Sequence, residues 1–354
     1  METLQTGKAV AGQRNAGIDL LRILAALYIV MLHTLGMGGI LENVAEGSYQ
    51  EQISDFLYFW SFCGVNIFGL ISGYVGYSEK EKPIAWKSMA SLWLEVVFYD
   101  VSMALLALRI LPDRASTADL PHLFFPILNN SHWYFTCYAA LLLFIPFLNS
   151  GVRQCSRKTL LQFLGAIFLV VIPIDTLFGH FHFYLGYSVA WLIVLYLVGA
   201  ILKKTNIGAK LPTPITIIGI VLMDVLSVWF FRNWVETTWF GYSISPAMAR
   251  YFTFPCHYIS AVLHLIVFSR LKLGPVVGKW ISALAPGAFA VYLINTQKHY
   301  WLGYLPGRYW YWANSSPLGI FVRVMAYSVL FVSVCLVVDF IRRQLIRLLR
   351  RKKT

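Results

Sequence analysis

Long apolar runs separated by short polar segments make up most of the chain. Each run has about 17 to 25 residues, the length that an α-helix needs to cross a hydrocarbon core about 30 Å thick. The runs lie near residues 15–36, 54–78, 88–110, 131–149, 159–178, 186–202, 211–231, 253–269, 280–301 and 318–341. The pattern predicts an all-α polytopic membrane helix bundle with about ten transmembrane helices.

Composition agrees with this class. Hydrophobic residues make up 58% of the 354 residues and charged residues only 13%, whereas a soluble domain carries roughly 25% charged residues. Residues 1–14 are polar, and the first apolar run is long enough to be a full span, so we expect no cleaved signal peptide. No linker or repeat interrupts the chain, which predicts a single membrane domain over residues 1–354.

Basic residues concentrate in alternate loops. If the N-terminus is cytoplasmic, the inner segments hold most of them: Lys8, Arg14, Lys80, Lys82, Lys87, Arg153, Arg157, Lys158, Lys203, Lys204, Lys210, Arg270, Lys272, Lys279 and the tail 342–354. The opposite loops hold Arg114, Arg232, Arg250 and Arg308. The positive-inside rule then places both termini, residues 1–14 and 342–354, in the cytoplasm. The net charge of +13 is thus a topology signal and does not indicate nucleic-acid binding.

Three polar residues stand out in the first span, "DLLRILAALYIVMLHT". At about 100° per residue, Arg22 and His33 share one helix face, about 16 Å apart along the axis. Asp19 precedes Arg22 by three residues, a spacing that allows a side-chain pair. One interpretation is an interfacial anchor and a satisfied buried histidine. The other is a functional pair, since intramembrane charges are costly and histidine suits general-base work.

Further polar residues occur in later spans. "GVNIFGLISGYVGY" carries Asn66, Ser72 and Tyr74, although its glycines are also typical of close helix packing. Glu95 and Asp100 fall within the third span. His132 opens the fourth span in "NNSHWYFTCY", where it is expected to line the same outer cavity as His33. "APGAFAVYLINTQKHY" carries Asn295 near its outer end, and Pro286–Gly287 is expected to open its backbone. The five cysteines have no metal-binding spacing, and no metal is expected.

Three segments in this order resemble the acyltransferase-3 family of bacterial integral-membrane O-acyltransferases. "RNAGIDLLRILAALYIVMLHT" carries its Arg-x10-His pattern as Arg22 and His33. "VNIFGLISGYVGY" is similar to its second-helix Ser-Gly-Tyr/Phe segment, and "SHWYFTCYAALLLFIPFLN" to its fourth-helix segment. The sequence departs from the family where many members have "YLIH", because Asn295 stands in place of that histidine. Its role would be dispensable here or taken over by another residue, such as His299.

The resemblance implies transfer of an acyl group, expected to be acetyl, from cytoplasmic acyl-CoA to a hydroxyl of an extracytoplasmic acceptor, a cell-surface or exopolysaccharide sugar. It implies a multi-pass protein of the bacterial inner membrane, with the lipid bilayer, acyl-CoA and a saccharide as partners. Arg22 would bind the donor, and His33 would act as general base. The expected substrate-binding residues are Asp19, Ser72, Tyr74, His132, Trp133, Tyr134 and Asn295.

Two other classes of protein are compatible with ten spans. A proton-coupled transporter or flippase of an envelope precursor would use buried His, Glu and Asp as a proton relay. No inverted repeat is visible, and such a protein has no need for the Arg22–His33 pattern. A catalytically silent receptor or scaffold is the third class, against which the retained histidine argues.

Overall fold

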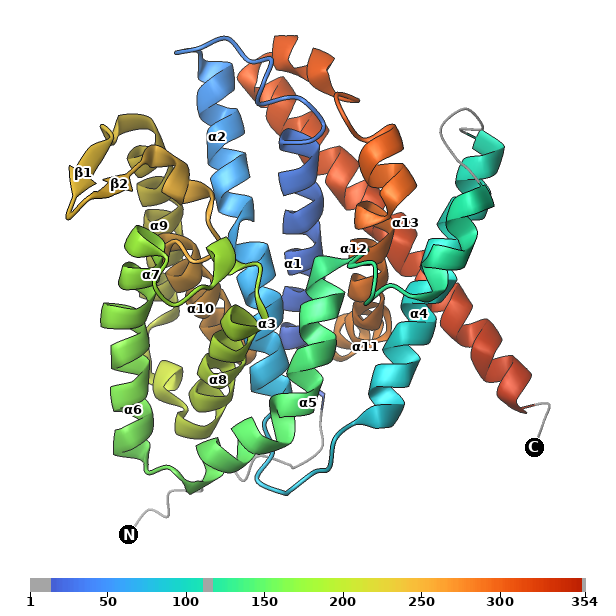
Figure 1. Cartoon of the computed structure of the whole chain (residues 1–354), viewed down its shortest axis with the longest axis horizontal. Helices are drawn as coiled ribbons and strands as arrows, with labels where there is room; N and C mark the ends of the chain where they lie inside the picture. Colours follow the sequence, from blue (N-terminus) through green and yellow to red (C-terminus); the bar gives the residue numbers. More distant parts are fainter. Residues whose placement is uncertain (1–13, 111–116, 352–354) are drawn as a thin grey trace.

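The computed structural model describes residues 14–110 and 117–351, so Lys8 and Arg114 of the topology prediction lie outside the described residues. Helices make up most of it, and one antiparallel hairpin, β1 (Thr237–Trp239) with β2 (Tyr242–Ile244), lies at the edge (Figure 1). The longer helices are α1 (Ala16–Leu35), α2 (Tyr49–Ser61), α3 (Cys63–Gly76), α4 (Trp86–Ile110), α5 (Trp133–Gln154), α6 (Arg157–Ala166), α7 (Ile172–Phe178), α8 (Val189–Thr205), α9 (Thr213–Asn233), α10 (Pro255–Arg270), α11 (Pro275–Leu284), α12 (Ala288–Thr296) and α13 (Pro317–Arg351).

The predicted polytopic helix bundle is confirmed. Within the described residues, nine helical segments are long and apolar enough to cross a membrane. The predicted sixth span corresponds to α8, which is shorter, with 17 residues, and packs against α3 and α5. Successive spans run in alternate directions, so that α1 begins and α13 ends toward the same end of the bundle (Figure 1).

Three spans are broken where proline, glycine or a change of helix type interrupts the hydrogen-bond ladder. The second span bends at Phe62, between α2 and α3. The fifth passes through a π-helical segment, η3 (Ile167–Val171), before Pro173 in the first turn of α7. The ninth is divided into α11 and α12 by a 3-10 turn, η7 (Ala285–Gly287). The expected opening at Pro286–Gly287 is therefore confirmed, because proline cannot donate a hydrogen bond to the preceding turn.

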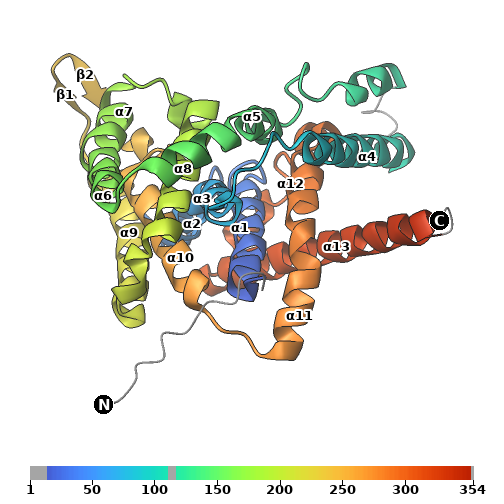
Figure 2. The ribbon, with the colours of Figure 1, turned by 90° about the horizontal axis from the view of Figure 1, so that it is seen from below.

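Helix α1 lies at the centre of the bundle. It packs against α2, α3, α10, α11, α12 and α13, and Figure 2 shows these helices around it. The Asn15 side chain caps its first turn by accepting hydrogen bonds from the backbone N–H groups of Gly17 and Ile18. A central helix has little freedom to rotate, so the polar residues on α1 have fixed directions.

Close packing of α3 against α8 accounts for glycines of the second-helix motif. A Cβ atom on Gly73 would overlap the backbone carbonyl of Tyr196, and one on Gly199 would overlap the carbonyl of Leu70. Each glycine thus admits the backbone of the other helix, as small residues do at membrane helix interfaces. Gly73 and its partner Gly199 are explained by packing alone.

The last helix extends further than predicted. Its apolar run ends near residue 341, but α13 continues to Arg351. Asp339 is fully buried and accepts hydrogen bonds from Arg342 and Arg343 one turn later, and Arg342 also pairs with Glu95 of α4 at 2.9 Å. These i,i+3 and i,i+4 pairs support a helical continuation. The predicted tail 342–354 therefore begins as helix.

Candidate functional site

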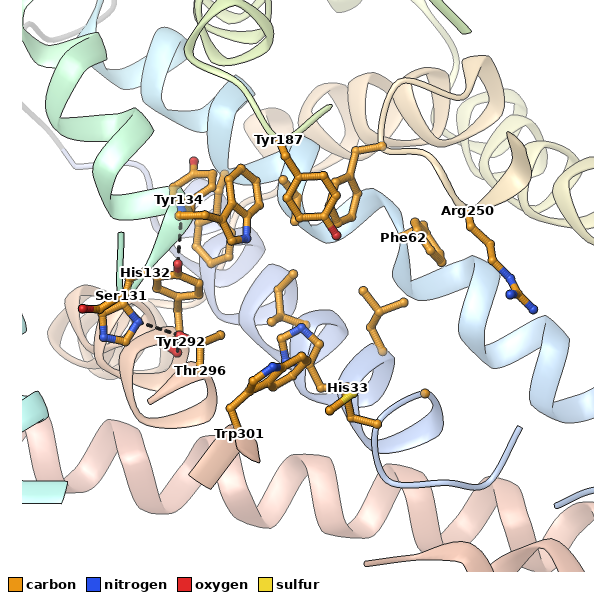
Figure 3. Close-up of a pocket in the computed structure, with 18 of the residues that line it drawn as sticks. His33, Phe62, Ser131, His132, Tyr134, Tyr187, Arg250, Tyr292, Thr296 and Trp301 are labelled. Carbon is orange, nitrogen blue, oxygen red and sulfur yellow. Dashed lines mark hydrogen bonds between the residues drawn. The ribbon is translucent and has the colours of Figure 1, made fainter. Parts of the chain in front are cut away.

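A cavity of about 400 Å³ lies beside the second half of α1, and Figure 3 shows the residues that line it. Its walls come from α1, the α2–α3 bend, α5, α12 and the segments that precede α8 and α10. Aromatic side chains dominate the lining. They are Tyr58, Phe62, Phe68, Trp133, Tyr134, Tyr187, Phe252, Phe289, Tyr292 and Trp301. The polar residues among them are His33, Asn130, Ser131, His132, Arg250 and Thr296.

His33 reaches this cavity from α1, and its orientation is fixed from two sides. Its Nδ1 atom is hydrogen-bonded to the Oδ1 atom of Asn295 on α12. The ring of Trp301 packs edge-on at a centroid distance of 4.5 Å. An amide oxygen can only accept, so the proton of a neutral imidazole lies on Nδ1. Nε2 then keeps its lone pair, which is the state that a general base requires.

His132 lines the same cavity, as predicted, but both of its ring nitrogens are engaged. Nε2 lies 2.8 Å from Oδ1 of Asp100 on α4, and Nδ1 lies 2.8 Å from Oγ1 of Thr296 on α12. Asp100 and His132 are each only 2% exposed. The two histidines therefore differ in chemistry: His33 has a free nitrogen, whereas the nitrogens of His132 are held by protein groups.

One wall of the cavity is a group of aromatic rings in contact with one another. Trp133 lies 4.5 Å from Tyr187 and 6.2 Å from Phe252, measured between ring centroids. Asn66 holds this wall in place from α3. Its Nδ2 donates to the carbonyl of Phe252 at 2.8 Å, and its Oδ1 accepts from Trp191 Nε1 at 2.9 Å. The polar Asn66 is thus explained by support of the wall.

Arg250 lies at the end of the cavity opposite His132 (Figure 3). It ends the short helix η6 (Pro246–Arg250), and its guanidinium carbon lies 4.9 Å above the ring of Phe231. Among the described lining residues it carries the one permanent positive charge. The cavity therefore has a neutral histidine side chain, His33, near its middle and a cation at one end.

Arg22 lies about 16 Å from His33 along the same continuous helix and does not line the cavity. The predicted pair with Asp19 is confirmed at 3.1 Å. Arg14 also contacts Asp19, at 2.5 Å, so the buried carboxylate has two cationic partners. The Arg22 side chain keeps 25% of its surface exposed. Part of this side chain is therefore not covered by the rest of the protein.

The structure places Ser72 and Tyr74 outside the lining of the cavity. The Ser72 hydroxyl donates to the carbonyl of Phe68 within α3 at 2.8 Å, and Tyr74 packs against the main hydrophobic core. Phe68, one turn away, does line the cavity. Positions 68 and 72 share one helix face, so Ser72 lies on the side of α3 that continues from the cavity toward the other end of the bundle.

The remaining predicted positions divide between the cavity and other places. Trp133, Tyr134 and Asn295 lie in or directly behind the cavity wall. His299 lines a different, mainly apolar cavity of about 350 Å³ beside α4 and α13. Residues 14–110 and 117–351 bring together no group of three or more His, Cys, Asp or Glu that would hold a metal ion.

Several site residues were not identified from the sequence. The sequence pattern marks Asp100 only as a polar residue of its span, and it does not distinguish Thr296, Tyr187, Arg250 or Trp301 from their neighbours. These residues meet others that lie far away in the sequence. His132 and Thr296, for example, are 164 positions apart. The sequence contains one indication that Thr296 belongs to the site: it is a polar residue next to Asn295, at the outer end of a predicted span.

The sequence matches the model of one known protein family. The model of the acyltransferase domain, acyltransferase-3, matches residues 15–341, which is nearly the whole chain. No curated protein and no solved structure matches the chain. The match covers the Arg22–His33 helix, the aromatic cavity and all the spans except the end of α13, and the chain therefore belongs to the acyltransferase-3 family of membrane acyltransferases.

Proposed function

We propose that this protein transfers an acyl group, most simply acetyl, from cytoplasmic acyl-CoA to a hydroxyl of an extracytoplasmic sugar. The observation that carries the proposal is the state of His33. This imidazole lines a cavity large enough for a sugar and a thioester, and Asn295 holds its Nδ1 so that Nε2 is free. The family match supports acyl transfer, and the donor and acceptor are inferred from the geometry and from the resemblance.

In the reaction, Nε2 of His33 takes the proton from the acceptor hydroxyl as its oxygen attacks the thioester carbonyl. The C–O bond of the ester forms, and the C–S bond of the thioester breaks. The protonated imidazole then returns the proton to the departing CoA thiolate, so His33 ends in its starting state. Trp301 restricts the ring edge-on and keeps the base aligned.

The donor enters from the other end of α1 in this proposal. The Arg22 side chain pairs with Asp19 and keeps 25% of its surface exposed, and arginine binds phosphate and carbonyl oxygens through its planar fork. The pantetheine arm would then follow the α3 face of Ser72 and Phe68 to the cavity. Ser72 thus borders the donor route and is not a nucleophile, since its hydroxyl is bonded to its own helix.

The acceptor occupies the aromatic end of the cavity. Sugar rings present apolar C–H faces that pack on aromatic rings, and Trp133 and Tyr187 supply such a surface. Arg250 at the rim favours an acceptor with a phosphate or carboxylate group. With both termini cytoplasmic, this end faces outward, which suits modification of surface or exported polysaccharide by a multi-pass protein of a bacterial inner membrane.

Acyl-CoA consumption by the purified protein in liposomes tests the proposal. We expect CoA release that depends on an added saccharide acceptor, together with an acylated sugar in equal amount. A transporter or flippase would move saccharide across the bilayer without releasing CoA. Transport without CoA release, in protein of verified fold, would therefore replace acyl transfer by the rival function.

A further inference from the structure

The C-terminal end of α12 connects the two histidines of the cavity. Asn295 accepts the hydrogen bond from His33 on α1, and the next residue, Thr296, bonds His132 at the start of α5. His132 in turn bonds Asp100 on α4. A continuous series of polar contacts thus joins α4, α5, α12 and α1, and it ends at the base that the proposed function uses.

Each hydrogen bond in this series has a defined donor and acceptor or shares a single proton. The Thr296 hydroxyl donates its proton to the carbonyl of Tyr292 at 2.9 Å, so its oxygen accepts from Nδ1–H of His132. One further proton lies between Nε2 of His132 and Oδ1 of Asp100. Whichever atom carries it, the pair has no net charge and no free nitrogen for a substrate. His132 is therefore unsuited to be a second base.

The end of α12 needs lateral support. This helix has only nine residues, follows a 3-10 turn, and is followed by the π-helical segment η8 (His299–Tyr304). Neither neighbouring segment continues its regular hydrogen bonding. Besides the Thr296–His132 bond, the backbone N–H of Tyr134 donates to Tyr292 Oη at 3.2 Å. Contacts from the start of α5 therefore fix where Asn295 lies.

We propose that Asp100 and His132 are positioning residues that hold Thr296, and through it Asn295, so that His33 keeps its productive orientation. The inference rests on the proposed role of His33 as general base. Asp100 does not line the cavity but bonds His132, so it acts through His132. A displacement of about 1 Å at a reacting group can cost about 100-fold in rate. The Asp100–His132 hydrogen bond is therefore able to control turnover, although three contacts separate Asp100 from His33.

Paired substitutions at Thr296 give the first test, because they change one atom group with little change of volume. Thr296→Val removes the acceptor for His132, and Thr296→Ser retains it. We expect Thr296→Val to lower kcat by about 10- to 100-fold with KM for acyl-CoA unchanged, and Thr296→Ser to keep kcat near that of the parent protein. Equal kcat in both variants would overturn the proposal.

Substitutions at Asp100 test the more distant member. In Asp100→Asn the amide can donate to Nε2 of a neutral His132, so the chain of contacts persists and kcat should fall less than about threefold. Asp100→Leu removes the hydrogen-bond partner of His132, and its kcat should fall as much as that of Thr296→Val. The control is Asp224→Asn, which changes a buried aspartate on α9 that bonds Ser260 and lies outside the cavity. A loss in Asp224→Asn as large as in Asp100→Leu would mean a general effect of buried polar groups.

A double variant separates this inference from the proposed function. If Thr296 acts through His33, then Thr296→Val should not lower the residual rate of His33→Ala any further, because the two changes remove the same contribution. An additional 10-fold loss in the double variant would show that Thr296 acts independently, and the positioning role would be wrong even though His33 remained the base. Near-normal turnover of His33→Ala alone would instead contradict the proposed function.

Discussion

His33 and Asn295 are 262 positions apart in the chain, and their side chains meet at the wall of the cavity through the imidazole Nδ1 and the amide oxygen. The contact gives a chemical meaning to the departure from the family's "YLIH" pattern. An asparagine at this position cannot exchange a proton, but its oxygen selects the tautomer in which the opposite nitrogen of His33 is basic.

Substitutions of Asn295 should therefore separate tautomer control from simple packing. Asn295→Leu preserves approximate volume but leaves Nδ1 without its acceptor, and we expect kcat to fall by about 10- to 100-fold. Asn295→Asp retains an acceptor oxygen and should stay much closer to the parent rate. Steady-state transfer measured for both variants checks this, and an aspartate variant as impaired as the leucine variant would refute tautomer control.

Arg22 is expected to act on donor binding and not on proton transfer. Arg22→Lys keeps the charge but loses the planar fork, so KM for acyl-CoA should rise while kcat changes less than in His33→Ala. Arg22→Ala should be more severe. Asp19 keeps its contact with Arg14 in either variant, so expression should persist. Calorimetric binding of acyl-CoA without acceptor should weaken in both variants. Unchanged affinity in Arg22→Ala would leave Arg22 as a membrane-interface anchor.

Arg250 should select acceptors by charge. With glucuronate and glucose as probe acceptors, Arg250→Gln is expected to raise KM for the carboxylated sugar by about 10-fold, in the range of a hydrogen bond to a charged group, and to leave glucose unaffected. Arg308→Gln is the matched control, since Arg308 also lies 4.9 Å from an aromatic ring, that of Tyr304, but outside the cavity. Equal effects on both sugars would contradict this role.

Gly73 should be required for stability and not for chemistry. Gly73→Ala forces a methyl group against the backbone of α8 at Tyr196, and overpacking of this kind costs about 1–3 kcal/mol. Gly165→Ala on α6 provides the control, because no atom beyond its chain neighbours and its own helix backbone lies within 4 Å of the added methyl group. Thermal unfolding in detergent should show a lower midpoint for Gly73→Ala alone. An unchanged midpoint would mean that the α3–α8 contact is looser than described.

Much of the fold follows from local sequence pattern. Apolar runs about 20 residues long give the membrane helices, and the spacing of Asp19 and Arg22 gives their ion pair, because both are properties of one segment. The same holds for the break at Pro286. Helix α13 is longer than its apolar run predicts, because its charged continuation is stabilised by a contact with Glu95 of another helix.

The sequence pattern predicts the site less completely than the fold, because the site depends on the orientation of each helix relative to its neighbours. His33, His132 and Trp133 were expected near one another, and all three line one cavity. Ser72 and Tyr74 are predicted to join them, but both lie outside the lining, and Gly73 between them packs against α8. The bonds of Asp100 and Thr296 to His132 depend on long-range packing that no spacing rule encodes.

The most direct test of the mechanism is the turnover of His33→Ala in liposomes, with acyl-CoA and acceptor saturating and with donor affinity and thermal unfolding measured on the same preparation. Removal of a general base should lower kcat by about 10²- to 10⁴-fold, while donor affinity and the unfolding midpoint stay those of the parent protein. Turnover within about threefold of the parent, in protein that binds acyl-CoA normally, would contradict a general-base role for His33.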